Sequence, residues 1–239
     1  MRRALVTGGA SPIGAAICRA LAADGFRVGI HAHRSIDRAT TLAAEITAAG
    51  GAADAVAFDI TDAAATRATI TGLLEAGPIQ VLVHNAGIHD DVPFAGMTEQ
   101  QWHDVIDVSL NGFHNVAGPM MLPMIGTRWG RIVAITSVAA LMGNRGQVAY
   151  AAAKAGLHGA VRALSLECAS RGVTVNAVAP GVIDTPATQG LLDRASLAAL
   201  IPMKRAGRPE EVADLVGFLA SDRAAYISGQ IISINGGMA

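Results

Sequence analysis

The amino-acid sequence predicts an α/β fold with a parallel sheet of about seven strands and helices on both of its faces. Short apolar strands alternate with helical segments from one end of the chain to the other, which is typical of such sheets. The first strand runs into a Gly-rich turn and then a helix, the arrangement that opens a Rossmann-type, doubly wound sheet. No repeat, low-complexity tract or linker interrupts the 239 residues, so we expect a single domain over residues 1–239.

Each element follows from a local pattern. Apolar, β-branched runs between turn residues predict strands at Arg3–Thr7, Phe26–Ala32, Asp54–Phe58, Ile79–Val83, Arg131–Thr136, Val173–Val178 and Ile231–Ile234. Alanine-rich or amphipathic segments predict helices at Ala15–Ala23, Ile36–Ala49, Asp62–Ala76, Thr98–Ile125, Tyr150–Ser170, Leu191–Leu200 and Glu210–Leu219. A Gly-broken loop is expected between Ser137 and Tyr150.

Composition narrows the classes of protein. Charged residues make up only 15% of the chain, well below the ordinary quarter, which indicates oligomer faces. The net charge of -1 gives no global attraction to nucleic acid. The apolar run at the N-terminus stops at Thr7, and no uncharged run is long enough to span a membrane. Cys18 and Cys168 lack metal or redox spacing, so we expect no metal site and a cytoplasmic location.

Three side chains in the second half of the chain form a pattern with chemical meaning. Tyr150 and Lys154 are four residues apart in an Ala-rich helix, so they share one face, and Ser137 follows the strand that can meet this face. An ammonium lowers the pKa of a nearby phenol, which suits the phenol to protonate the alkoxide formed when a carbonyl is reduced. A hydroxyl can hold the same oxygen. A surface Tyr and Lys at chance spacing is the alternative.

The Gly-rich turn Gly8–Gly14 is expected to bind phosphate. Backbone N–H groups and the dipole of the following helix face an anion there, and the missing G-K-S/T argues against a nucleotide-hydrolysing loop. Arg34 lies twenty residues past Gly14, and no acidic residue precedes it on the second strand. Arginine at this place accommodates a 2′-phosphate, so we expect NADP(H) as cofactor. An ordinary tight turn and a solvated Arg34 are the alternatives.

Ordered motifs carry a resemblance to a known family. In chain order they are T-G-G-A-S-P-I-G at 7–14, D-I at 59–60, N-A-G at 85–87, S-L-N-G around Asn111, Ser137, Y-A-A-A-K at 150–154, N-A-V-A-P-G at 176–181 and S-I-N-G-G-M near the C-terminus. With these motifs the chain resembles the short-chain dehydrogenases/reductases over its whole length. Within that family, M-K-R-A-G-R-P-E-E-V is similar to bacterial 3-oxoacyl-acyl-carrier-protein reductases. G-I-H-D-D-V-P-F-A-G-M is similar to reductases of aryl-polyene clusters.

The resemblance implies a role for each site residue. Tyr150 would be the general acid, Lys154 would lower its pKa and bind the nicotinamide ribose, and Ser137 would hold the carbonyl. Asn111, in a local break of the long helix, would position a water that feeds protons through Lys154. The implied cofactor-binding residues are Gly8, Ser11, Pro12, Ile13, Gly14, Arg34, Ser35, Asp59, Ile60, Asn85, Ala86, Gly87, Tyr150, Lys154, Pro180, Gly181, Ile183 and Thr185.

Two positions depart from the family pattern. Pro12 stands where the family has its middle glycine, after Ser11 where an Arg or Lys often helps to bind the 2′-phosphate. Proline loses one N–H donor, although its fixed φ suits the first position of a helix. His84 replaces a frequent Asn, and we expect it to be buried and hydrogen-bonded rather than catalytic.

The function that the resemblance implies is NADPH-dependent reduction of 3-oxoacyl thioesters, presented by an acyl carrier protein, to 3-hydroxyacyl thioesters in fatty-acid or polyene-type biosynthesis. The alternatives are a reductase or dehydrogenase of free small alcohols, ketones or sugars, and a weakly active cofactor-binding partner subunit. A homotetramer is expected. Arg128 and Arg171 match the carrier-docking arginines of the 3-oxoacyl reductases and are expected near the mouth of the active site, with two solvated arginines as the alternative.

Overall fold

The computed structural model describes residues 1–188 and 193–239 and has one seven-stranded sheet, in the order β3-β2-β1-β4-β5-β6-β7. Every neighbouring pair is parallel. The strands are β1 (Arg3–Thr7), β2 (Arg27–Ala32), β3 (Ala52–Ala57), β4 (Val81–His84), β5 (Gly130–Ile135), β6 (Val173–Pro180) and β7 (Ile231–Ile234). The order reverses between β1 and β4, where sheets of this kind open a ligand crevice at their carboxyl ends. The Rossmann-type prediction is confirmed.

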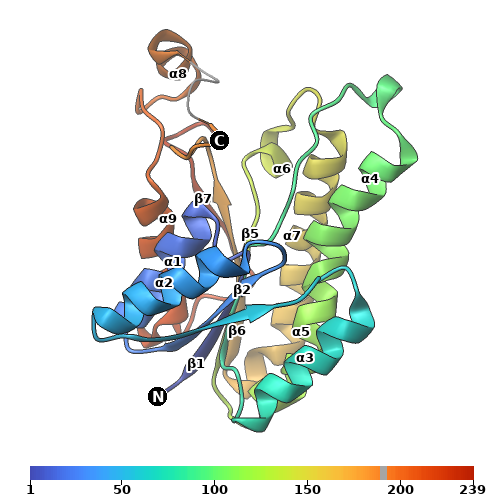
Figure 1. The fold of residues 1–239 in the computed structure, drawn as a ribbon. Helices are drawn as coiled ribbons and strands as arrows, with labels where there is room; N and C mark the ends of the chain where they lie inside the picture. The colour runs from blue at the N-terminus through green and yellow to red at the C-terminus, as the bar shows by residue number, and fades with distance from the viewer. Residues whose placement is uncertain (189–192) are drawn as a thin grey trace.

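Helices cover both faces of the sheet (Figure 1). Their bounds are α1 (Pro12–Ala23), α2 (Ile36–Ala48), α3 (Ala63–Glu75), α4 (Glu99–Ile106), α5 (Gly112–Gly126), α6 (Ala139–Met142), α7 (Val148–Cys168), α8 (Arg194–Leu200) and α9 (Pro209–Ala220). α1, α2 and α9 pack on one face, and α3, α5 and α7 on the other. Each face buries its own apolar cluster, one around Ile17, Leu21 and Val216 and the other around Met120, Leu157 and Val161.

The long helix expected over Thr98–Ile125 is interrupted. A π-helical turn, Asp107–Asn111, separates α4 from α5. The α-helical ladder has i→i−4 bonds, so a π turn adds one residue and rotates every later side chain relative to the earlier ones. The predicted break near Asn111 is confirmed, and its geometry decides which side chains face the site.

Three further segments differ from expectation in their details. The loop between Ser137 and Tyr150 contains the short helix α6. Helix α1 begins at Pro12 itself, after Ser11 as its N-cap, so proline occupies the helical position that needs no N–H. The first two residues of the helix predicted over Leu191–Leu200 lie outside the described residues, and α8 occupies the rest from residue 194.

Within the described ranges, no helix is both long and apolar enough to cross a bilayer.

Candidate active site

Ser137, Tyr150 and Lys154 meet beyond the carboxyl end of β5. Ser137 lies two residues after that strand, and α7 carries Tyr150 and Lys154 on its first two turns. Ser137 hydrogen-bonds the Tyr150 side chain. All three line a hollow of about 590 Å³. The structure therefore brings together the three residues that the sequence predicted as a group.

Lys154 is buried, with 3% of its surface exposed. Its Nζ donates to the Ile135 carbonyl oxygen at 2.9 Å and lies 5.8 Å from the centroid of the Tyr150 ring. Burial disfavours the charged form and lowers the pKa of Lys154 to about 8. The Lys154 ammonium is thus held close to the Tyr150 ring, although burying its charge is unfavourable.

The net pKa shift of Tyr150 in this structure is upward, not toward neutral pH as the Tyr150–Lys154 spacing had suggested. Burial raises the pKa of the Tyr150 phenol, the Ser137 hydrogen bond opposes this, and the Asp91 charge adds to the rise. Tyr150 therefore keeps its proton at neutral pH. A protonated phenol is the form that can donate to a nascent alkoxide.

Asn111 does not join this group. Its side chain is exposed and donates to Asp107 Oδ1 at 2.6 Å, one turn back along the helix. The π turn directs Ser109 inward instead: a Cβ placed on Gly87 would lie 3.3 Å from Ser109 Oγ and 2.8 Å from Lys154 Nζ. Ser109 is the residue of the S-L-N-G motif that faces the site, and the sequence analysis missed it.

His84 is fully buried, as expected. Its Nε2 lies 2.9 Å from the Ser109 carbonyl oxygen and its Nδ1 3.3 Å from Thr7 Oγ1. Burial and the Lys154 charge lower its pKa to about 3, so the imidazole is neutral.

The phosphate turn after β1 is held by the side chains of Asn85, which follows β4, and of Ser11 in the turn itself. Asn85, just after β4, donates to the Thr7 and Gly8 carbonyls and to Ser11 Oγ at 2.9–3.1 Å. Ser11 Oγ in turn accepts from Gly14 N at the start of α1. Gly8 has a φ of +60°, and a Cβ on Gly14 would overlap the Gly8 carbonyl oxygen. Glycine is therefore required at both positions, and the turn leaves room for an anion.

A second hollow of about 620 Å³ lies between this turn and the ends of β2 and β3. Arg34, Ser35 and Asp59 line it as predicted, and so do His33 and Arg38, which the sequence analysis missed. Arg38, in α2, donates to the Ala10 carbonyl at 2.5 Å, beside the position where the family often has a basic residue. The sequence could have indicated Arg38, because it lies about one helical turn after Arg34.

One predicted contact in this region, that of Ile60, needs correction, while Asp59 keeps its place. The Asp59 carboxylate accepts from the backbone N–H and hydroxyl of Thr61, at 2.9 and 2.8 Å, so part of its bonding capacity is used locally. Ile60 is 4% exposed and packs under Gly112 in the core, so its side chain does not line the hollow.

The segment after β6 closes the other side of the active site. Pro180, Gly181, Ile183 and Thr185 all line the 590 Å³ hollow. Ile183 pairs with Gly207 in an isolated parallel bridge.

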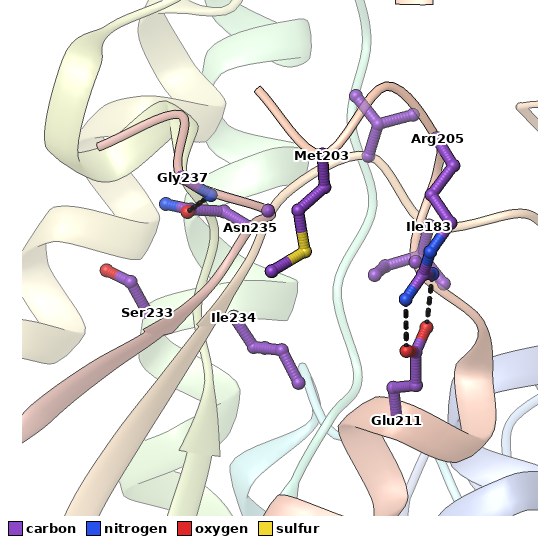
Figure 2. Close-up of a pocket in the computed structure, with 11 residues that line it drawn as sticks. Ile183, Met203, Arg205, Glu211, Ser233, Ile234, Asn235 and Gly237 are labelled. Carbon is purple, nitrogen blue, oxygen red and sulfur yellow. Dashed lines mark hydrogen bonds and ion pairs between the residues drawn. The ribbon is translucent and has the colours of Figure 1, made fainter. Parts of the chain in front are cut away.

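On the far side of this segment lies another hollow, of about 390 Å³, shown in Figure 2. Arg205 and Glu211 form a two-bonded ion pair on its wall, and Glu211 also accepts from Arg208 N at 2.7 Å. These contacts anchor the loop before α9, which pairs with Ile183 through Gly207, to the start of α9.

His89, Asp91 and Gln147 form a polar cluster at the substrate side of Tyr150. The His89 ring meets the Tyr150 ring edge-on at 6.0 Å between centroids, and its Nδ1 lies 3.0 Å from Asp91 Oδ1. Gln147 donates to both Asp91 oxygens. No role was predicted for these residues from the sequence, although His89 and Asp91 lie in the G-I-H-D-D segment that is similar to aryl-polyene reductases.

Arg128 and Arg171 lie at the amino ends of the strands, whereas Tyr150 lies beyond their carboxyl ends. Both precede strands, and β5 and β6 start side by side with Gly130 opposite Val173. Ser137 and Tyr150 lie beyond the carboxyl end of β5. The expectation that these arginines surround the mouth of the active site within one chain is therefore wrong.

The two large hollows adjoin, since Ser11 and Ile88 line both of them. Together they form a trough from Arg34, past the phosphate turn, to Tyr150. Its basic end, glycine-lined middle and buried Tyr–Lys end fit a nicotinamide dinucleotide. In the part of the chain that the structure describes, no group of His, Cys, Asp or Glu could hold a metal ion.

A Rossmann-type sheet with a phosphate turn after β1 and a Ser–Tyr–Lys group beyond β5 defines a nicotinamide-dependent oxidoreductase. The family described as Enoyl-(Acyl carrier protein) reductase matches residues 8–239. With that match over nearly its whole length, the chain belongs to the short-chain dehydrogenase/reductase family.

Named relatives are similar over almost the full chain. The 3-oxoacyl-[acyl-carrier-protein] reductase FabG of Aggregatibacter actinomycetemcomitans is 42% identical over 236 residues, covering 98% of both chains. The protein of the same name from Escherichia coli (strain K12) is 42% identical over 238 residues, or 98% of this chain and 96% of the relative. That of Staphylococcus epidermidis (strain ATCC 35984) is 40% identical over 240 residues, or 99% and 98%.

Proposed function

We propose that this protein reduces 3-oxoacyl thioesters, carried by an acyl carrier protein, to 3-hydroxyacyl thioesters with NADPH. The Ser137–Tyr150–Lys154 group is the observation that carries the proposal, because it supplies a carbonyl holder, a protonated phenol and a buried cation around one hollow. The full-length similarity to relatives named as reductases of this class supports it.

The residues divide the chemistry between them. When bound, the nicotinamide supplies a hydride to the carbonyl carbon. Ser137 holds the carbonyl oxygen, and Tyr150 donates its proton to that oxygen as the electron pair of the C=O bond moves onto it. The Lys154 ammonium stabilises the phenolate that remains. Tyr150 recovers a proton from solvent before the next turnover, so the balance is one hydride and one proton per carbonyl.

Three basic side chains favour NADPH over NADH. Arg34, Arg38 and His33 line the same end of the trough, so both guanidinium groups would be available to hold a 2′-phosphate there. Arg38 supplies the charge that Ser11 lacks. Asp59 Oδ2 lies 3.6 Å from His33 Nε2, and the bonds from Thr61, helped by the nearby Arg34 charge, lower the pKa of Asp59.

The assembly proposed is a homotetramer of single-domain chains in the cytoplasm. Leu122 on α5 and Leu166 on α7 are 82% and 84% exposed, so both helices present apolar side chains that a second copy would cover. As a narrower proposal, the likeness of the His89 segment to aryl-polyene reductases supports a polyene-type synthesis as the pathway.

The test is NADPH oxidation with three substrate types. Acetoacetyl thioesters should be reduced far faster than free ketones, and crotonyl thioesters should not be reduced, since Tyr150 and Ser137 are arranged for a carbonyl oxygen. A preference for free ketones would favour the small-substrate alternative. If the protein binds NADPH but reduces none of the three substrate types, the partner-subunit alternative would be favoured.

A further inference from the structure

His84 ties the end of β4 to the π turn of the helix beside it. A carbonyl oxygen only accepts hydrogen bonds, so the ring nitrogen 2.9 Å from the Ser109 carbonyl, Nε2, must carry the proton. Nδ1 then accepts from the Thr7 hydroxyl, whose oxygen accepts from the Asn85 and Ala86 amides at 3.0 Å. Both nitrogens of a neutral ring are thereby used.

The carbonyl that His84 binds belongs to the residue whose side chain faces Lys154. Ser109 is fully buried, and among the described residues its hydroxyl has no hydrogen-bond partner. Buried hydroxyls normally have one. Measured from a Cβ placed on Gly87, Ser109 Oγ lies at 3.3 Å and Lys154 Nζ at 2.8 Å. The two atoms are therefore no more than about 6 Å apart, which brings them into the range that one water making two hydrogen bonds of about 2.8 Å can span.

We propose that His84 is a positioning residue for the reduction. By binding the Ser109 carbonyl it holds the π turn, and so keeps the Ser109 hydroxyl beside Gly87, where hydroxyl and ammonium share one water. That water gives a proton to Lys154 as Lys154 gives one to the Tyr150 phenolate, and solvent replaces it. The inference rests on the proposed function, because the need to return a proton arises only from carbonyl reduction.

The charges around His84 agree with a neutral ring. Lys154 and His31 are the charged or titratable groups that act on it, and both disfavour the imidazolium. A protonated ring would also lose its bond from Thr7. His84 should therefore keep one tautomer throughout the working pH range.

The first test is NMR of the wild-type protein with ¹⁵N-labelled histidine. His84 should show the neutral, Nε2-protonated tautomer from about pH 5 to 8. Titration in that range, or a proton on Nδ1, would overturn the proposal. This readout needs no substrate, so it stands even if thioester reduction is not observed and the proposed function fails.

The second test separates positioning from folding. His84→Phe fills the volume without either hydrogen bond. We expect kcat to fall about tenfold or more, KM for NADPH and thioester to stay within about twofold, and the solvent deuterium isotope effect on kcat to rise. His84→Gln keeps an N–H near Nε2 and should hold kcat within about threefold. A rise in KM instead of a fall in kcat would contradict the proposal.

Ser109→Ala tests whether His84 acts through Ser109. It should lower kcat about as much as His84→Phe, and the double variant should be no slower than the slower single one, since both remove the same arrangement. Ser165→Ala is the matched control, because Ser165 is also a buried serine, on α7, whose hydroxyl donates to the Arg162 carbonyl, and it should keep full activity. The inference would be overturned if the losses of kcat in the two single variants multiplied in the double variant, or if Ser109→Ala left kcat unchanged. If His84→Phe does not fold, His84→Gln, Ser109→Ala and the tautomer decide it.

Discussion

Replacing Lys154 with methionine should remove activity and make the protein more stable near neutral pH. Burial lowers the pKa of Lys154 from 10.5 to about 8. A shift of about 2.5 units corresponds to a cost on the order of 3 kcal/mol for carrying the charge in the folded protein. Methionine removes that cost but leaves the Ile135 carbonyl without its donor at 2.9 Å, a loss of about 1–2 kcal/mol. The expected net gain is about 1–2 kcal/mol, or roughly 2–8 °C in Tm.

The gain should depend on pH with a definite sign. Below about pH 8 Lys154 is charged in the folded and unfolded chain, so the wild type carries the whole cost. Between about pH 8 and 10.5 the unfolded chain binds more protons at this residue, so wild-type stability rises relative to the variant. Above pH 10.5 both states are neutral and the gain disappears.

Urea unfolding at pH 7, 9 and 10.5, at one protein concentration, measures this difference. Lys204→Met, at an exposed lysine, is the matched control and should show no such pH dependence. A Lys154→Met protein that is less stable at pH 7, or a difference that is constant with pH, would refute the reasoning.

Further predictions follow from the same site. Tyr150→Phe should lower the reduction rate by at least about a hundredfold while NADPH still binds in a fluorescence titration; activity within a few-fold of wild type would remove Tyr150 as the acid. Arg34→Asp should lower the ratio of kcat/KM for NADPH over NADH by about tenfold or more, and a wild type that prefers NADH would contradict this assignment. Reversing both charges, Arg128→Glu with Arg171→Glu, should impair carrier-bound substrates strongly and small thioester mimics little, and less so at high salt. Equal loss on both substrate types would indicate damage to folding or catalysis.

The sheet could be predicted because each strand has its own local pattern. Apolar runs between Gly and polar residues fix the strands to within two residues, and their alternation with helices dictates parallel pairing. Ser137, Tyr150 and Lys154 could be placed together for the same reason, since one follows a strand and two share a helical face.

Asn111 was assigned to the site by the resemblance, which predicted a break of the helix near it but not which residue of the break faces inward. A single π turn between α4 and α5 shifts the inward face by part of a turn, and no local residue pattern here marks it. Ser109 then faces Lys154 and Asn111 faces solvent. The burial of Tyr150 was also invisible in sequence, and burial is the largest cause of its raised pKa.

The position of the two arginines was misread although the sequence contained the signal. A residue just before a parallel strand lies at its amino end, whereas ligands bind at the carboxyl ends. Arg128 and Arg171 both precede strands, so within one chain they cannot border the Tyr150 hollow.

A second copy would reconcile this placement with a docking role. Helix α7 has 21 residues, about 30 Å, with Tyr150 near its start and Arg171 three residues past its end. If two chains pair α7 antiparallel, Arg171 of each lies beside the Tyr150 end of the other, and the exposed Leu166 becomes buried between them. The docking surface would then exist only in the oligomer. Leu166→Glu, which places a charge in that contact, should give smaller particles in light scattering and should lose the advantage of carrier-bound over mimic substrates, while reduction of the mimics persists. A monomer that still prefers the carrier-bound substrate would show that docking does not require arginines from a second copy.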